Sequence, residues 1–112
     1  MANDWVKEVD IAITVSDKNG KFIEMNDKSL KTFADDGGAA LLGSDIMDCH
    51  NENSKDIIKD IISEKRNNVY FVEKEGKRKL IYQAPWTING EFQGLVELSI
   101  VIPPDIETKV RG

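Results

Sequence analysis

The sequence predicts an α+β fold in which helices pack on one face of a five-stranded antiparallel sheet. Turn signals for hairpins occur near both ends of the chain, at residues 17–20 and 89–90. Between them, residues 26–65 place apolar side chains at helical spacing. The length of 112 residues matches one domain. Two hairpin-rich halves of one sheet, with helices between them, are therefore expected.

The first part of the chain is expected to form a helical turn and then a hairpin. Residues 4–10 mix apolar and charged side chains, which predicts the turn. Residues 11–16 are rich in β-branched side chains, which favour a strand. Asp, Asn and Gly at residues 17–20 favour a tight turn, so residues 21–25 are expected to return as the second strand.

Two helices are expected in the middle of the chain. Asn26 is a good N-cap because its side-chain oxygen can accept bonds from free backbone N–H groups, so a helix is expected over residues 27–35. The glycines at residues 37–38 favour its end. A second amphipathic helix is expected over residues 54–65. Its apolar stripe is formed by Ile57, Ile58, Ile61 and Ile62.

Three strands are expected in the last part of the chain, over residues 69–72, 79–86 and 92–102. Alternate residues of the last strand fall on opposite faces. The wholly apolar or glycine set is expected to face the helices: Phe92, Gly94, Val96, Leu98 and Ile100. The other set is expected on the outer face: Gln93, Leu95, Glu97, Ser99 and Val101. Gln83 either orients a polar ligand or lies on the outer face, which is the favoured interpretation.

The composition excludes several classes of protein. The net charge of −5 argues against nucleic acid and anionic membranes as partners, because both require clustered Lys and Arg. One cysteine excludes an internal disulfide, and the N-terminus does not resemble a signal peptide, so a cytoplasmic location is expected. One His and one Cys cannot make a zinc site of the usual four ligands unless carboxylates supply the rest.

Three segments in this order resemble a PAS domain. Residues 11–26 are similar to the opening PAS hairpin, residues 42–46 (Leu-Gly-Ser-Asp-Ile) resemble its short turn before the long helix, and residues 89–96 resemble its closing hairpin. The resemblance implies a sensory or interaction module that holds a small ligand between the helices and the inner sheet face.

The chain is expected to divide into three parts. Residues 1–10 form an N-terminal segment that can support dimerisation, residues 11–102 the PAS domain, and residues 103–112 a flexible tail.

The resemblance extends to a possible haem site. Cys49 lacks the flanking residues of the flavin-binding motif. Residues 48–53 are similar to a segment that carries haem in some bacterial chemoreceptor PAS domains. This similarity implies that His50 is the metal ligand of a haem b cofactor. The alternative is a loop histidine that bonds the start of the next helix.

If haem binds, it is expected to lie between the second helix and the sheet. The expected lining is His50, Ile57, Ile58, Ile61, Leu80, Tyr82, Trp86, Val96 and Leu98. Tyr82 and Trp86 can instead be aromatic core residues. Gly94 leaves room either for a ligand or for a neighbouring helix.

Three functions remain open from the sequence. The first is a sensory domain that binds a small ligand, with haem and gas or redox sensing as one form of it. The second is a cofactor-free interaction module, and the third is an enzyme that modifies haem. No acid–base pair or nucleophile stands out, so an enzyme is not expected. A homodimer is expected because Leu95 and Val101, together with Trp5 and Val9, would leave apolar surface exposed.

Overall fold

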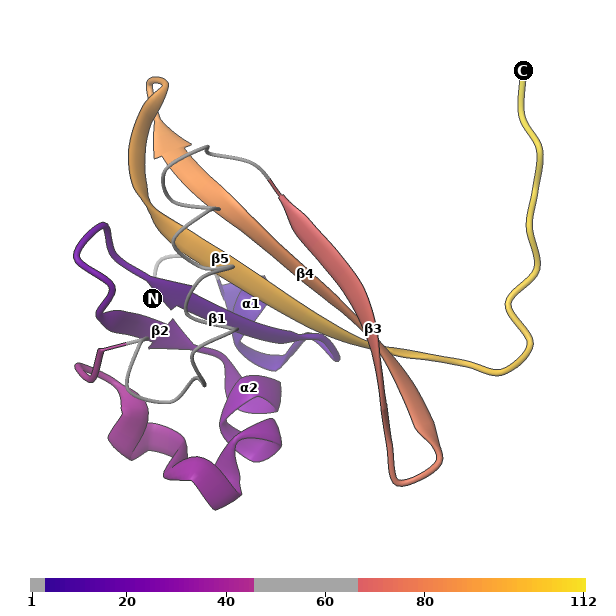
Figure 1. The fold of residues 1–112 in the computed structure, drawn as a ribbon, viewed down its shortest axis with the longest axis horizontal. Helices are drawn as coiled ribbons and strands as arrows, with labels where there is room; N and C mark the ends of the chain where they lie inside the picture. The colour runs from indigo at the N-terminus through magenta and orange to yellow at the C-terminus, as the bar shows by residue number, and fades with distance from the viewer. Residues whose placement is uncertain (1–3, 46–66) are drawn as a thin grey trace.

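The computed structural model describes residues 4–45 and 67–112. Its strands form one antiparallel sheet in the order β2-β1-β5-β4-β3 (Figure 1). The elements are α1 (Asp4–Glu8), β1 (Ala12–Ser16), β2 (Phe22–Met25), α2 (Asp27–Thr32), β3 (Asn68–Lys74), β4 (Lys77–Ile88) and β5 (Glu91–Ile102). The predicted fold class is confirmed. The predicted helix over residues 54–65 lies outside the described residues.

Asn26 joins three elements at the start of α2. Its Oδ1 accepts from the backbone N–H of Ser29 at 3.0 Å, which caps the helix as predicted, and from that of Ile13 in β1 at 2.9 Å. Its Nδ2 donates to the carbonyl oxygens of Val6 in α1 and Ile11 at 2.9 and 2.8 Å. The side chain is 6% exposed. One amide therefore holds α1, β1 and α2 in place.

Helix α2 is shorter than the sequence predicted. It ends at Thr32 and is followed by two 3-10 turns, Ala34–Asp36 and Gly38–Leu41. Gly37 separates the two turns with a φ of 119°, a conformation that glycine adopts without steric cost. The glycines thus reverse the chain after the helix, as expected, but the regular helix stops before them.

The hairpin between β4 and β5 has the predicted turn chemistry. Asn89 and Gly90 have φ values of 51° and 83°, which are the paired positive angles of a type I′ turn. Strands β4 and β5 are longer than expected, at 12 residues each. Pro85 is tolerated in β4 because pairing with β3 ends at Gln83, so the missing N–H has no strand partner on that side.

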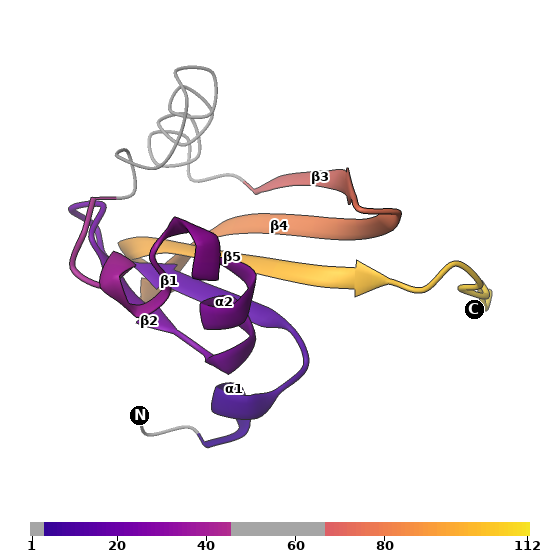
Figure 2. The same cartoon turned by 90° about the horizontal axis from the view of Figure 1, so that it is seen from below.

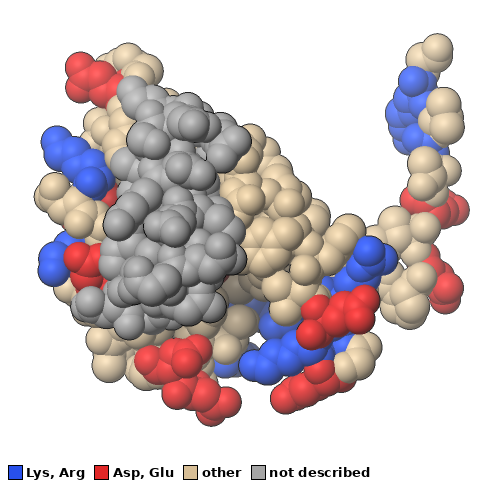
Figure 3. Space-filling model, in the orientation of Figure 1, with Lys and Arg blue, Asp and Glu red and all other residues tan. Residues whose placement is uncertain are grey.

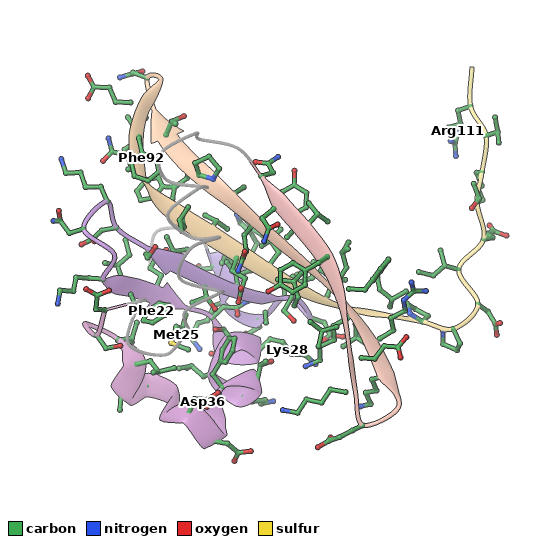
Figure 4. The ribbon with its side chains drawn as sticks, viewed as in Figure 1. Phe22, Met25, Lys28, Asp36, Phe92 and Arg111 are labelled. Atoms are coloured by element: carbon green, nitrogen blue, oxygen red, sulfur yellow. The ribbon has the colours of Figure 1, made fainter. Side chains whose placement is uncertain are left out.

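The described helices lie at the β1–β2 end of the sheet. Both views place α1 and α2 beside these strands and away from β3 (Figures 1 and 2). Figure 4 shows Phe22 and Met25 of β2 next to α2, and Arg111 far from the sheet in the C-terminal segment. In the described ranges, no helix has the length and apolar character needed to cross a membrane.

Strand register defines the two faces of the sheet. Thr14 of β1 lies opposite Glu97 of β5, which lies opposite Gln83 of β4. Directly opposed residues point to the same side. The Thr14 hydroxyl lies 2.6 Å from the Ser29 hydroxyl of α2. We call the face that carries Thr14, Gln83 and Glu97 the inner face, because α2 packs on it.

The outer face is formed by the alternate residues of the same strands. It is almost wholly apolar over the central strands. Its members include Ile13, Val15, Val69, Phe71, Leu80, Tyr82, Val96, Leu98 and Ile100. None of these side chains is fully buried, and Val69 and Phe71 are 49% and 51% exposed.

The sequence prediction of the two faces was wrong for the helix that the structure describes. Val96 and Leu98 were expected under the helices, but they lie on the outer face, where they pair with Val15 and Ile13. Gly94 and Ile100, also expected under the helices, fall on the outer face by alternation. Leu95 and Gln83 were expected outside, yet they are buried on the inner face.

Val101, which was also expected outside, falls on the inner side by alternation and is exposed at the end of β5. The prediction of the two faces failed for a physical reason. The inner face of the central strands mixes polar side chains with the apolar Ile81 and Leu95, so it is less apolar than the outer face, and a rule that buries the more apolar face selects the wrong one.

Candidate ligand-binding site

A row of polar side chains crosses the inner face. Its members are Asn68, Gln83, Glu97 and Thr14, which are paired in register across β3, β4, β5 and β1. Asn68 Nδ2 donates to Gln83 Oε1 at 2.9 Å, and Gln83 Nε2 donates to Glu97 Oε1 at 2.8 Å. Gln83 is only 8% exposed. We call these four residues the polar row.

The carboxylate fixes the direction of the hydrogen bonds in the polar row. An ionised carboxylate only accepts, so Gln83 must turn its NH₂ group toward Glu97. The Gln83 oxygen then faces β3, where it accepts from the Asn68 amide. One negative charge therefore orients two amides on two neighbouring strands.

The other end of the polar row reaches α2. Thr14 is 7% exposed and Ser29 is fully buried, and their hydroxyls lie 2.6 Å apart. Because α2 starts at the Asn26 cap, this contact links the inner face to the junction that holds α1. In the described part of the chain, every buried side-chain nitrogen or oxygen has a hydrogen-bond partner.

Tyr70 stands beside the polar row on β3. It pairs with Ile81, which pairs with Ser99, so all three share the inner face. Burial raises the pKa of the Tyr70 phenol above its ordinary value of 10.0, and the negative charge of Glu97 raises it further. The field of the carboxylate therefore extends across β4 to β3.

The predicted site residues are not brought together on the inner face. Leu80, Tyr82, Val96 and Leu98 lie on the outer face, where Asn67 Nδ2 donates to the Tyr82 hydroxyl at 2.7 Å. The remaining predicted lining and the predicted metal ligand lie outside the described residues: His50, Ile57, Ile58 and Ile61. Their proposed role in a cofactor site stays a prediction.

The indole N–H of Trp86 has a hydrogen-bond partner within the protein, so no ligand is needed to explain this residue. Its indole Nε1 donates to the carbonyl oxygen of Ser16 at 3.0 Å. Trp86 pairs with Gly94, and a Cβ added at Gly94 would lie 1.9 Å from that same oxygen. Glycine is therefore required for the close approach of β1 to β5, and Gly94 leaves room for the backbone rather than for a ligand.

Sequence reasoning missed the polar residues of the inner face. Glu97, Asn68, Thr14 and Tyr70 were not expected to form a site, and Gln83 was favoured on the outer face. The available signal was polar side chains in the middle of apolar strands at alternating positions, Gln83 on one strand and Glu97 with Ser99 on the next. Register then places them side by side.

Metal-ligating side chains do not cluster in the described ranges. No group of three or more His, Cys, Asp or Glu side chains there could hold a metal ion. In the view of Figure 3, acidic side chains gather at the lower edge, and basic and acidic side chains lie together at the lower right.

No protein-family model matches the chain, and no curated protein sequence matches it. Solved structures do match in fold. A C-terminal domain from Streptococcus mutans has a TM-score of 0.75 at 22% identity, covering 92% of this chain and 84% of that one. The PAS domain of the histidine kinase ThkA has a TM-score of 0.66 at 17% identity, covering 80% of this chain and 97% of that one.

The chain has the PAS fold. A third match is the Aer2 receptor from Vibrio cholerae, described as a dual PAS-haem oxygen sensor. It has a TM-score of 0.60 at 15% identity, covering 83% of this chain and 95% of that one. The PAS fold predicted from the hairpins and the segment order is confirmed by these likenesses.

Proposed function

We propose that this PAS-fold domain is a sensory domain that binds a small, hydrogen-bonding ligand on its inner face. The polar row is the observation that carries the proposal. Its position also supports it, because a ligand there would lie beside Thr14 and thus beside the contact to α2. Matching structures with this fold include parts of a histidine kinase and of an oxygen-sensing receptor.

The polar row is difficult to explain by stability alone. Burying an amide and a carboxylate removes their hydration, and replacing such groups with well-packed apolar residues is often neutral or stabilising. The neighbours Ile81 and Leu95 on the same face are apolar and buried. Packing of the sheet core therefore does not require Gln83 and Glu97, whereas binding of a ligand with hydrogen-bond donors and acceptors does require polar side chains.

A second candidate is haem binding through His50, which the fold likeness to the Aer2 receptor supports. The described inner-face residues do not fit a haem macrocycle, because a buried amide and a carboxylate occupy the centre of that face. The apolar residues expected around haem lie on the outer face. Visible absorption after haem addition, with His50→Ala as the comparison, tests this candidate directly.

The partner that we propose is a second copy of this chain, bound through the outer face. This face is apolar, and Val69 and Phe71 on it are about half exposed. Trp5 of α1 is 70% exposed and supplies further apolar surface. Exposed apolar patches usually mark interfaces, and two-fold dimers are the commonest closed assembly.

A reducing cytoplasmic location is part of the proposal because the chain has one cysteine.

Native mass spectrometry of the purified protein, followed by thermal-shift screening of small molecules, tests the sensory proposal. The expected result is a co-purified small molecule or a compound that raises the Tm of the wild type. The Tm increase should be lost in Gln83→Leu, which removes both hydrogen bonds of the central amide. A protein that binds no small molecule in either experiment would contradict the proposal and favour the cofactor-free interaction module.

A further inference from the structure

Glu97 brings a negative charge onto the inner face. Its side chain is half-buried, lies opposite Gln83 and Thr14, and accepts from Gln83 through Oε1. Both opposing residues are uncharged, so neither balances the carboxylate. The charge of a half-buried carboxylate acts more strongly on nearby groups than a fully hydrated charge does, because less water screens it.

No cation of the described residues pairs with Glu97. The ion pairs there are Lys7–Asp27, Lys28–Asp10 and Lys109–Glu107. Lys79 is on the same face but lies opposite Val101, four residues farther along β5 than Glu97. The negative charge at the centre of the face is therefore left without a positive partner in this part of the chain.

The charge of Glu97 also acts on Tyr70 of β3. The pKa of its phenol is raised by burial and then by the charge of Glu97. Tyr70 and Glu97 lie on strands separated by β4, so the carboxylate acts on groups across the inner face. A ligand on this face would experience the same potential.

We propose that the ligand of the inner face carries a positively charged nitrogen, such as a primary ammonium or a guanidinium group, and that this group binds Glu97. The inference rests on the proposed sensory function and names the chemical class of its ligand. A charge-assisted bond to the carboxylate is stronger than a neutral one, and the carboxylate repels anionic ligands of similar size. The Gln83 amide holds Oε1, which leaves Oε2 for the ligand.

The test is a binding screen with matched compounds. Primary amines and guanidines of small size, such as putrescine and agmatine, are compared with alcohols and carboxylates of the same length, such as 1,4-butanediol and succinate. Binding is measured by thermal shift and by titration calorimetry with the wild type, Glu97→Gln and Glu91→Gln. Glu91→Gln removes the same charge at the exposed start of the same strand.

The expected result is binding confined to the cationic compounds. Their Kd should rise about tenfold or more in Glu97→Gln, since a hydrogen bond to a charged group is worth about 1.5–3 kcal/mol, and should not change in Glu91→Gln. The amide oxygen introduced by Glu97→Gln can still accept from Gln83, so the fold should persist, which circular dichroism checks.

Three other outcomes each overturn a defined part of the account. Binding of neutral or anionic compounds alone would overturn the cation inference and leave the sensory function standing. Cation binding that is equal in Glu97→Gln and the wild type would also overturn it. Binding of no compound in any class would overturn the cation inference, and the absence of a co-purified small molecule in native mass spectrometry as well would overturn both. If Glu97→Gln fails to fold, Glu97→Asp replaces it, with weaker cation binding expected because the shorter side chain withdraws the charge.

Discussion

Replacing Asn26 with Ala should destabilise the domain more than any other single amide substitution within residues 4–45. The side chain makes four hydrogen bonds, to two backbone N–H groups and two carbonyl oxygens. It is buried, so the groups that it leaves cannot all be hydrated. Loss of a helix N-cap alone costs about 1 kcal/mol.

The three hydrogen bonds of Asn26 other than the helix cap determine how much further the free energy of unfolding falls. An unsatisfied buried group costs about 1–3 kcal/mol, but these three bonds are only partly buried, so water recovers much of that cost. A total of about 3 kcal/mol follows, which is a large fraction of the usual stability of about 5–15 kcal/mol. At about 4 °C per kcal/mol for a domain of this size, the Tm should fall by about 12 °C.

Thermal and urea unfolding followed by circular dichroism measure this change. Asn19→Ala is the matched control, because Asn19 is exposed in the β1–β2 turn and its bond to Asp17 uses the backbone N–H. Asn26→Asp keeps the acceptor for Ser29 but points an oxygen at two carbonyl groups, so it should also be destabilising. If Asn26→Ala unfolds within about 1 °C of the wild type, the junction does not hold the N-terminal half together.

Three further predictions concern the sheet. Gly94→Ala should abolish folding or lower the Tm strongly, because the new Cβ would lie 1.9 Å from the Ser16 carbonyl oxygen. Glu97→Gln should lower the pKa of Tyr70, measured by ultraviolet titration, because it removes the second cause of the increase. Since the folded state holds the Tyr70 proton more tightly, wild-type stability should decrease as the pH rises above 10.0, and less so in Glu97→Gln. Phe71→Ser should weaken the proposed dimer in sedimentation equilibrium, because this side chain is half exposed on the outer face.

Each of these predictions has a control. Gly90→Ala also places alanine at a positive φ, but nothing lies within 4 Å of the new Cβ, so only the strain of about 1–3 kcal/mol is expected. Glu91→Gln should leave the titration of Tyr70 unchanged. Ile88→Ser removes an exposed side chain at the hairpin end and should not affect association. Equal effects of a test variant and its control would contradict the corresponding prediction.

Local signals in the sequence predicted the elements of the fold well. The turn at residues 17–20, the Asn26 cap and the Asn-Gly turn at residues 89–90 depend on interactions within a few residues. Such interactions can be read from the sequence because the partners are adjacent in it. The order of hairpins and helices then limits the topology to a small number of folds.

The faces of the sheet could not be read in the same way. Hydropathy favoured burial of Val96 and Leu98, whereas the structure buries Gln83 and leaves the apolar residues on the outer face. The bonds that make Gln83 tolerable inside come from Asn68 and Glu97, each more than ten residues away. A buried polar group is acceptable only with its partners in place, and these partners are visible only once the register is known.

The most direct test of the inner-face site compares two adjacent residues of β4. Gln83 points to the inner face and Tyr82 to the outer face, so Gln83→Leu and Tyr82→Leu alter opposite sides of one strand. The measurement is the Kd of a small molecule that raises the Tm of the wild type, determined by titration calorimetry with both variants. We predict that Gln83→Leu abolishes binding and that Tyr82→Leu leaves the Kd unchanged. Loss of binding in Tyr82→Leu with retention in Gln83→Leu would contradict the account and place the ligand on the outer face.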